Sequence, residues 1–306
     1  MSESYLRSVA LMGTVVTVQV VEHGENRPER QEREAGVTRA LDWFHEVASR
    51  CTRFDPGSEV NQLCARVGEP VPVSDLLFEA VRFALAVAEE TDGAFDPTVG
   101  ALMEARGFNR EYRTGAIVRV ATDTGTAATY RDVAIDEARR TVTLRTPLVL
   151  DLGAVVKGLA IDLAARELEP FHDFAIDAGG DLYLGGRNAF GESWSVGIRN
   201  PREREHILTT LRVRDTAVCT SGDYERPVPG DSGDHHIVDA RAGLSATSIA
   251  SATVIAPSAM VADALSTAAF VLGPVEGLAL LQRHGVEGLL VTPALEQFAT
   301  PGWSHA

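Results

Sequence analysis

Residues 146–168 read TPLVLDLGAVVKGLAIDLAAREL, and their order of features is that of an anion-binding loop. An apolar run ends at Asp151, a glycine turn follows, and Lys157 and Gly158 open a helix-like segment. This order favours an anion, because the amides at a helix N-terminus and the lysine ammonium both carry positive charge. The stretch matches neither the Walker loop nor the dinucleotide fingerprint. An ordinary strand-to-helix turn with a solvent-facing lysine is the alternative, and the loop alone does not decide between them.

The 306-residue chain has the composition of a soluble globular protein, with 45% hydrophobic and 23% charged residues. Its net charge of −15 argues against a broad nucleic-acid surface, because such a surface needs basic patches. It holds three cysteines, and no two of them have the C-x-x-C spacing of a metal site. We therefore expect no disulfide framework, no structural zinc and no nucleic-acid partner.

The N-terminal stretch MSESYLRSVALMGTVVTVQVVEHG is rich in β-branched residues, and it predicts a strand over residues 9–21. It lacks an A-x-A-like cleavage site, and no early cysteine is present to anchor a lipoprotein. No uncharged stretch reaches the roughly 20 apolar residues that a bilayer span requires. The expectation is a cytoplasmic protein without a membrane span.

Periodicity and turn residues predict a mixed α+β fold. Helical spacing predicts helices over residues 37–48 and 76–90 and another that ends at Gly273, while FAIDAGGDLYLGG (174–186) predicts two strands around a Gly-Gly turn. Strands come in pairs between helices, which favours antiparallel sheets with packed helices over a doubly wound parallel sheet. We expect one domain over residues 1–306, with any division into two lobes falling near the polar stretch 109–130.

A second candidate site is ADALSTA (262–268). Asp263 and Thr267 are four residues apart, so on a helix they share one face. A carboxylate and a hydroxyl among apolar neighbours suit a hard cation such as Mg²⁺, which takes oxygen ligands. The alternative is an exposed Asp263 near a helix start and a Thr267 hydroxyl bonded to a backbone carbonyl.

Three further stretches carry polar side chains at turns or strand ends. In HHIVDA (235–240), two adjacent histidines would point to opposite faces of a strand, and either one near neutral pKa could accept a proton. GAFDPTVG (93–100) predicts a loop with one exposed carboxylate, and CTSGDYER (219–226) predicts a turn that offers hydroxyls and amides to an anion. The alternatives are structural histidines in the first stretch, a helix-to-helix connector in the second and a plain hairpin turn in the third.

Taken in order, these stretches resemble the ApbE family, the FAD:protein FMN transferases. The matches span about residues 11 to 292, and they are MGT (12–14), RFDPGSEV (53–60), GAFDPTVG (93–100), LDLGAVVKGLAID (150–162), AGGDLYLGG (178–186), TSGDY (220–224), HHIVD (235–239) and ADALSTAAFVLG (262–273). The resemblance implies an α+β, T-fold-like architecture and a Mg²⁺-dependent reaction. In that reaction FAD is cleaved at its pyrophosphate, FMN is attached by a phosphoester to a threonine or serine of an acceptor flavoprotein, and AMP leaves.

The resemblance also implies the roles of individual residues. Magnesium would be held by the carbonyl of Ala154 and by the side chains of Asp263 and Thr267. The residues that fall where the family contacts the flavin nucleotide are Met12, Phe54, Ala94, Phe95, Asp96, Asp151, Lys157 and Ile237. His236 is the candidate proton acceptor for the incoming hydroxyl, and Asp151 and Asp239 are its competitors.

The chain departs from the family pattern at several places. Ala240 and Ala242 replace a proline and a threonine after the histidine loop, and Asp177 replaces an asparagine before the Gly-Gly turn. Cys64 stands where the family has asparagine, and Ser266 stands where it has a small apolar residue. Three functions therefore remain open from the sequence: an FMN transferase, an FAD pyrophosphatase that gives FMN and AMP, and a non-catalytic FAD-binding protein.

Overall fold

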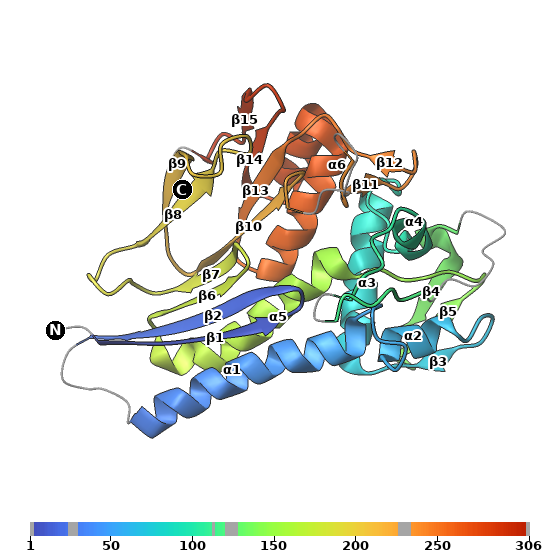
Figure 1. Cartoon of the computed structure of the whole chain (residues 1–306), viewed down its shortest axis with the longest axis horizontal. Coiled ribbons are helices and arrows are strands. Elements are labelled where there is room, and N and C mark those ends of the chain that lie inside the picture. Colours follow the sequence, from blue (N-terminus) through green and yellow to red (C-terminus); the bar gives the residue numbers. More distant parts are fainter. Residues whose placement is uncertain (1–2, 24–29, 112–113, 120–127, 226–233, 304–306) are drawn as a thin grey trace. The chain divides into compact units, whose positions relative to one another are not determined.

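A computed structural model of the chain describes residues 3–23, 30–111, 114–119, 128–225 and 234–303. The chain divides into two compact units (Figure 1). Unit one comprises residues 1–46, 157–222 and 247–306, and unit two comprises residues 47–156 and 223–246. The stretch 109–130 therefore falls inside unit two, although residues 112–113 and 120–127 lie outside the described part.

Unit one is built on an eight-stranded sheet within the described residues, and every neighbouring pair in it is antiparallel. Its strands in spatial order are β1 (Glu3–Leu11), β2 (Thr14–Glu22), β6 (Phe174–Ala178), β7 (Asp181–Gly185), β10 (Thr216–Gly222), β13 (Ser251–Ala256), β14 (Glu287–Val291) and β15 (Gln297–Ala299). The predicted α+β class with antiparallel pairing is confirmed.

The predicted single strand over residues 9–21 is wrong, because the chain turns back on itself there. Met12 and Gly13 both have positive φ, 51° and 77°, and they connect β1 to β2 with Leu11 paired to Thr14. Two left-handed residues form the tight turn that matches the twist of a hairpin. Methionine rarely adopts this conformation, so the turn gave no signal in the sequence.

The two faces of the sheet in unit one have different covers. On one face, α6 (Ala259–Arg283) packs against β10, β13 and β14 (Figure 1). On the other, the hairpin of β8 (Trp194–Arg199) and β9 (Ile207–Val213) closes an apolar cluster. The buried residues of that cluster are Leu184, Ile198, Leu211, Val213, Val218, Leu289 and Val291. Alternation along β10 thus sends Val218 to the hairpin and Cys219 toward α6, where its Sγ lies 3.7 Å from the carbonyl oxygen of Ala259.

Helix α6 is long and apolar enough by composition to span a membrane, because its most apolar 18-residue stretch has a mean hydropathy of 1.7. Within unit one, 61% of that window is buried, as in the core helix of a globular protein. Gly273 breaks the helix with φ 81°, directly before Pro274, so α6 consists of two helical segments. The predicted helix end at Gly273 is confirmed.

Unit one also contains most of α1 (Arg30–Cys51) and α5 (Gly153–Leu168), followed by a 3-10 turn at Glu169–Phe171. Arg33 of α1 forms a buried ion pair with Glu22 of β2 at 2.6 Å. Arg39 and Trp43 both donate to the carboxylate of Glu167 on α5, at 3.0 and 3.2 Å. These contacts hold α1 against both β2 and α5.

Unit two has three helices, two small sheets and a 3-10 turn among its described residues. The elements are α2 (Glu59–Cys64), β3 (Val71–Pro72), α3 (Asp75–Glu90), α4 (Gly100–Ala105), η1 (Tyr130–Asp132), β4 (Val133–Asp136), β5 (Thr141–Leu144), β11 (Val238–Asp239) and β12 (Leu244–Ser245). The order in the larger sheet is β3-β5-β4. The Ser74 side chain accepts from the amide of Leu77 and caps α3.

Candidate active site

Helices α5 and α6 interlock through Gly158 and Asp162, which are four residues apart on α5. The Asp162 carboxylate accepts from Ser258 Oγ at 2.7 Å and from the amides of Ala259 and Met260 at 2.7 and 3.0 Å. It therefore accepts hydrogen bonds from the first backbone amides of α6, which have no acceptor within the helix. A Cβ on Gly158 would lie 2.4 Å from the Ala259 carbonyl oxygen, so only glycine allows this approach. The K-G-x-x-x-D spacing is thus explained by helix packing.

The same interlock buries Asp263, whose residue exposure is 4%. Its Oδ2 accepts from the amide of Gly158 at 3.3 Å. The exposed Asp263 of the alternative reading is therefore wrong. The backbone carbonyl of Asp263 accepts the hydroxyl of Ser266, while the Thr267 hydroxyl lies 2.9 Å from Ser221 Oγ on β10. The alternative interpretation expected the Thr267 hydroxyl to donate to a backbone carbonyl, but it is Ser266 that makes such a hydrogen bond.

Lys157 is the only lysine in the chain, and its ammonium pairs with the carboxylate of Asp181 on β7. The Asp181 side chain is 3% exposed, and its Oδ1 also accepts from the amide of Thr220 at 3.0 Å. Burial alone would lower the pKa of Lys157, but the carboxylates of Asp181 and Asp263 outweigh it and raise the pKa above its ordinary value. Lys157 is therefore firmly cationic at neutral pH, and it is not an ordinary solvent-facing lysine.

Residues Thr220 to Gly222 belong to β10, paired with β13, so the turn predicted for CTSGDYER does not begin there. The Thr220 amide, expected to meet an anion, meets the chain's own Asp181. Cys219 is fully buried, and burial raises the pKa of its thiol well above the ordinary value.

The oxygen donors of unit one fit a hard cation. No group of three or more His, Cys, Asp or Glu side chains in the described ranges is placed to hold a metal. Mg²⁺ does not need such a group, because it commonly keeps its waters and takes one or two carboxylates plus substrate phosphates. Asp263 and Thr267 offer a carboxylate and a partly exposed hydroxyl one helical turn apart. Ala154 lies in the first turn of α5, in the part of the chain assigned to unit two.

In unit two, Arg53 organises Asp151 and Phe54. Its Nε donates to Asp151 Oδ2 at 2.7 Å, and its guanidinium lies 4.2 Å from the centre of the Phe54 ring. It also donates to the carbonyl of Phe108. The other carboxylate oxygen of Asp151 accepts the amide of Gly153 at 2.9 Å, at the start of α5. Arg53 directly precedes Phe54 in the RFDPGSEV motif, but no spacing in the sequence marks it as a partner of Asp151.

Cys64, one of the departures from the family pattern, holds the irregular segment that leads to Asp151. Its Sγ accepts from the amide of Leu150 at 3.5 Å, the bond an asparagine oxygen could also make. Burial raises the pKa of the Cys64 thiol to about 11, so it stays protonated and unreactive near neutral pH.

The GAFDPTVG loop does not present an exposed carboxylate, because Asp96 is 8% exposed. Its Oδ1 accepts the amide and hydroxyl of Thr98, at 2.8 and 2.7 Å, and its Oδ2 accepts the amide of Tyr130 at 2.9 Å. Burial raises the pKa of Asp96, and these hydrogen bonds offset only part of the effect. Phe95 is also buried, and the carbonyl of Ala94 accepts the amide of Ala240 at 3.3 Å. Asp96 thus shapes the loop.

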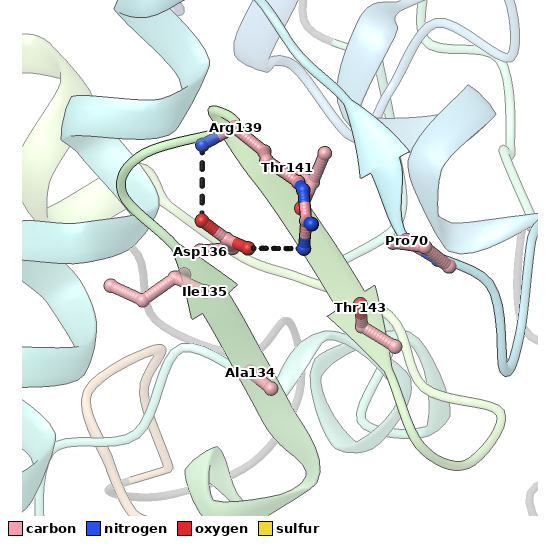
Figure 2. Close-up of a pocket in the computed structure, with 7 residues that line it drawn as sticks. All are labelled: Pro70, Ala134, Ile135, Asp136, Arg139, Thr141 and Thr143. Atoms are coloured by element: carbon pink, nitrogen blue, oxygen red, sulfur yellow. Dashed lines mark hydrogen bonds and ion pairs between the residues drawn. The ribbon is translucent and has the colours of Figure 1, made fainter.

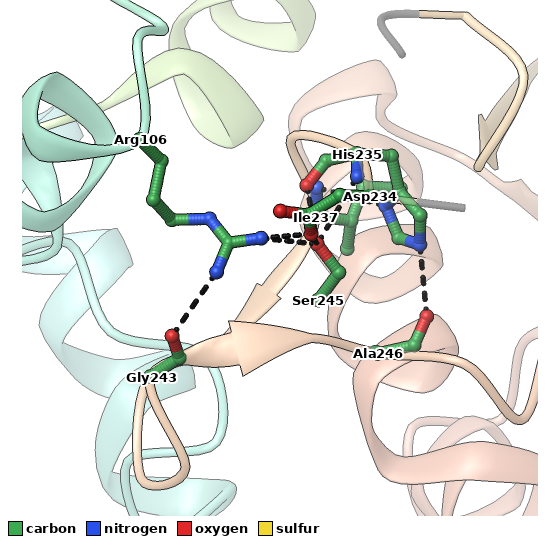
Figure 3. Close-up of polar contacts among 7 residues, drawn as sticks. All are labelled: Arg106, Asp234, His235, Ile237, Gly243, Ser245 and Ala246. Carbon is green, nitrogen blue, oxygen red and sulfur yellow. Dashed lines mark hydrogen bonds and ion pairs between the residues drawn. The ribbon is translucent and has the colours of Figure 1, made fainter. Parts of the chain in front are cut away.

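The two adjacent histidines have different surroundings, and Figure 3 shows those of His235. His235 is buried, its Nε2 donates to the carbonyl of Ala246 at 2.9 Å, and its Nδ1 accepts from the amide of Ile237 at 3.2 Å. Both ring nitrogens are engaged in a neutral tautomer, so His235 is a structural residue. His236 is half-buried and lies edge-on to Phe108, with ring centres 6.4 Å apart. Only Val238–Asp239 of the predicted HHIVDA strand forms a strand, β11.

The lowered pKa of His235 predicts that the protein loses stability in mild acid. Burial lowers its pKa from 6.5, so as the pH falls the unfolded chain takes up the proton first. Its contribution is present above pH 6.5 and is lost as the pH falls toward the folded pKa, by at most about 1.4 kcal/mol per pH unit. Urea unfolding of the native protein and of His235→Gln between pH 7.5 and 5.5 measures this. Equal pH dependence in the two proteins would contradict it.

An arginine clamp holds the loop that follows the histidines, as Figure 3 shows. Arg106, at the end of α4, donates to Gly243 O at 3.2 Å and to Ser245 Oγ at 2.7 Å, and it pairs with Asp234. These bonds position the loop that carries Ala240 and Ala242 in place of the family's proline and threonine. No sequence pattern marks Arg106, because it lies far from this loop along the chain.

Two further predicted positions are set by turns. Met12 lies at the tip of the β1–β2 turn in unit one. Asp177, which replaces the family's asparagine, accepts the amide of Gly180 at 2.8 Å and stabilises the Gly-Gly turn. Ile237, the remaining predicted flavin contact, is buried beside His235 in unit two.

A shallow hollow in unit two is separate from these residues (Figure 2). It is lined by Pro70, Ala134, Ile135, Asp136, Arg139, Thr141 and Thr143. Arg139 closes back onto Asp136 through its amide, at 3.0 Å, and its guanidinium, at 3.2 Å. None of the predicted site residues lines this hollow, so it is not the candidate active site.

Known proteins resemble this chain in sequence and in fold. The model of the ApbE family matches residues 12–290. The FAD:protein FMN transferase of Treponema pallidum is 30% identical over 319 residues, covering 97% of this chain and 87% of that protein. The enzyme of the same name from Escherichia coli is 30% identical over 241 residues, covering 76% of this chain and 69% of its own length.

Solved structures of similar proteins have the same fold. The ApbE protein of Thermotoga maritima superposes with a TM-score of 0.84 at 29% identity and covers 99% of both chains. The flavin transferase ApbE of Vibrio cholerae, at 24% identity, has the same fold with a TM-score of 0.84. The family model covers nearly the whole chain, and the motifs described above lie within its range. The chain therefore belongs to the ApbE family.

Proposed function

We propose that the protein is a Mg²⁺-dependent FAD:protein FMN transferase. A hydroxyl of a threonine or serine on an acceptor flavoprotein attacks the phosphorus of the FMN half of FAD. The phosphoester forms as the bond to the AMP half breaks, and AMP leaves. The observation that carries the proposal is the Lys157–Asp181–Asp263 cluster in a chain 30% identical, over 97% of its length, to a protein with this name.

Charge neutralisation is the main chemical requirement of such a transfer, because little covalent chemistry falls to the protein. The raised pKa of Lys157 keeps a full positive charge in unit one for the negatively charged pyrophosphate. Asp263, Thr267 and the carbonyl of Ala154 would hold Mg²⁺, which when bound supplies further positive charge to the phosphate oxygens. Asp181 acts through Lys157 and is a positioning residue.

His236 is proposed as the proton acceptor for the incoming hydroxyl. Its neighbour His235 has both ring nitrogens engaged, so it is not available. Both carboxylate oxygens of Asp151 accept hydrogen bonds, one from Arg53 and one from the Gly153 amide, so this residue holds the loop in place and is not the proposed base. For Asp239, burial raises the pKa, but the hydrogen bonds from Arg241 outweigh it and the net pKa is lowered, which makes the carboxylate a weak base.

The remaining family positions are proposed as flavin-nucleotide contacts. In unit two these are Phe54, Ala94, Phe95, Asp96, Asp151 and Ile237, and in unit one they are Met12 and Lys157. The Arg53 guanidinium over the Phe54 ring and the hydrogen bonds around Asp96 support the proposal, because they hold both motifs in a defined geometry. The cytoplasmic location expected from the sequence is part of the same proposal.

The test is incubation of the purified protein with FAD, Mg²⁺ and a family-type acceptor domain. Chromatography should show AMP, and mass spectrometry should show FMN added to a threonine or serine of the acceptor. Omitting the acceptor separates transfer from hydrolysis: FMN and AMP released to water would favour the pyrophosphatase. Intact bound FAD under both conditions would favour a non-catalytic binding protein.

A His236→Asn variant tests the proposed base. It should bind FAD with unchanged affinity and transfer FMN about a hundredfold or more slowly, as expected when a general base is lost. A His235→Gln variant, assayed at pH 7.5, is the matched control and should retain transfer. Full activity of His236→Asn would assign the proton to another acceptor.

A further inference from the structure

Three hydroxyl groups in unit one form a single hydrogen-bonded chain that ends on a backbone carbonyl. Thr267 Oγ1 lies 2.9 Å from Ser221 Oγ, Ser221 Oγ lies 2.8 Å from Ser266 Oγ, and Ser266 Oγ lies 2.9 Å from the carbonyl oxygen of Asp263. Ser221 belongs to β10 and the other residues to α6. The chain therefore connects the strand to the turn of helix that carries Asp263 and Thr267.

The direction of this chain follows from a count of protons. Three oxygen–oxygen contacts each need one proton between them, and three hydroxyls supply one proton each. A carbonyl oxygen cannot donate, so Ser266 must give its proton to Asp263. Ser221 must then donate to Ser266, and Thr267 must donate to Ser221. No other assignment places one proton in every contact.

The direction determines what the Thr267 hydroxyl can bind. Its proton is committed to Ser221, so its oxygen presents lone pairs only. Such an oxygen attracts a cation or a hydrogen-bond donor, and it cannot donate to a phosphate. Ser266 is fully buried, whereas Thr267 is partly exposed. A ligand can therefore reach the row of hydroxyls at Thr267, where the oxygen can only accept a hydrogen bond or bind a cation.

We propose that Ser221 and Ser266 are positioning residues that orient the Thr267 hydroxyl as a ligand for a divalent cation. This inference rests on the proposed Mg²⁺ dependence of the site. Groups that hold a metal ligand in orientation typically change metal affinity by about 10–100-fold when removed. Ser221 touches Thr267 directly and matters more, while Ser266 acts one bond further away by fixing the direction in which Ser221 donates.

The test is the affinity of the full-length protein for Mg²⁺. It is measured by competition against Mn²⁺, whose free concentration is read by electron paramagnetic resonance. Ser221→Ala should raise the dissociation constant by about tenfold or more, and Ser266→Ala by less than Ser221→Ala. Thr253→Val is the matched control. It removes a hydrogen bond of the same length, 2.9 Å between Thr253 Oγ1 and Thr220 Oγ1, that is not part of the series formed by Thr267, Ser221 and Ser266. Its affinity should be unchanged.

The outcomes separate this inference from the proposed function. If the native protein binds Mg²⁺ and both serine variants bind it equally well, the orienting role is wrong while the metal site stands. If the native protein binds neither ion, both proposals fall. Thermal unfolding checks that each variant folds, and Ser266→Ala, which restores the small apolar residue of the family pattern, carries the test if Ser221→Ala does not fold.

Discussion

Lys157→Met is expected to lose both FMN transfer and a substantial part of the protein's stability. The variant leaves the carboxylate of Asp181, 3% exposed, without its ammonium partner and with Asp263 still nearby. Removing one partner of a buried ion pair typically costs about 3–5 kcal/mol of unfolding free energy. Transfer should fall at least a hundredfold, because a group that offsets charge in the transition state is lost.

A double variant separates the two effects. In Lys157→Met with Asp181→Leu, no uncompensated carboxylate remains from the pair, and apolar replacement of a whole buried pair is often neutral for stability. Urea unfolding should therefore show most of the lost stability restored, while AMP release stays at the level of Lys157→Met. Recovery of activity together with stability would show that Lys157 serves only the fold.

Asp263→Asn is expected to abolish Mg²⁺-dependent activity without weakening the fold. The asparagine oxygen can still accept from the amide of Gly158, as Asp263 Oδ2 does. Two carboxylates and one ammonium leave one formal negative charge in the cluster, and the substitution removes it. Loss of a metal ligand should cost several kcal/mol in the transition state, about a thousandfold in rate.

Thermal unfolding with and without Mg²⁺ provides a measurement of Asp263→Asn that does not depend on activity. A ligand that binds only the folded state raises the unfolding temperature. Mg²⁺ should therefore stabilise the native protein and leave the variant unchanged. Asp177→Asn, which changes an exposed carboxylate at the Gly-Gly turn, is the control and should behave like the native protein. A variant still stabilised by Mg²⁺ would place the metal elsewhere.

Local patterns predicted the elements whose cause lies within a few residues. The α3 helix follows from its apolar spacing and from the Ser74 cap, and the break in α6 follows from Gly273 before Pro274. The β6–β7 hairpin follows from its Gly-Gly turn. By contrast, the Met12–Gly13 turn was missed, because the pairing of β1 with β2 imposes a left-handed conformation that methionine does not favour.

The candidate site shows the same division between local and long-range causes. The glycine turn followed by a lysine at a helix start marks Lys157 in the sequence, and the four-residue spacing on one helix marks Asp263 and Thr267. Asp181 and Ser221 carry no such mark. They acquire their roles only where the sheet brings β7 and β10 beside α5 and α6.

Sequence order was therefore sufficient for the family, the α+β class and the residues of each motif. The charge state of Lys157, the burial of Asp263, the structural role of His235 and the direction of the Thr267 hydroxyl required the folded chain. The physical reason is that desolvation and hydrogen bonding act between groups that are near in space, and these partners are far apart in sequence.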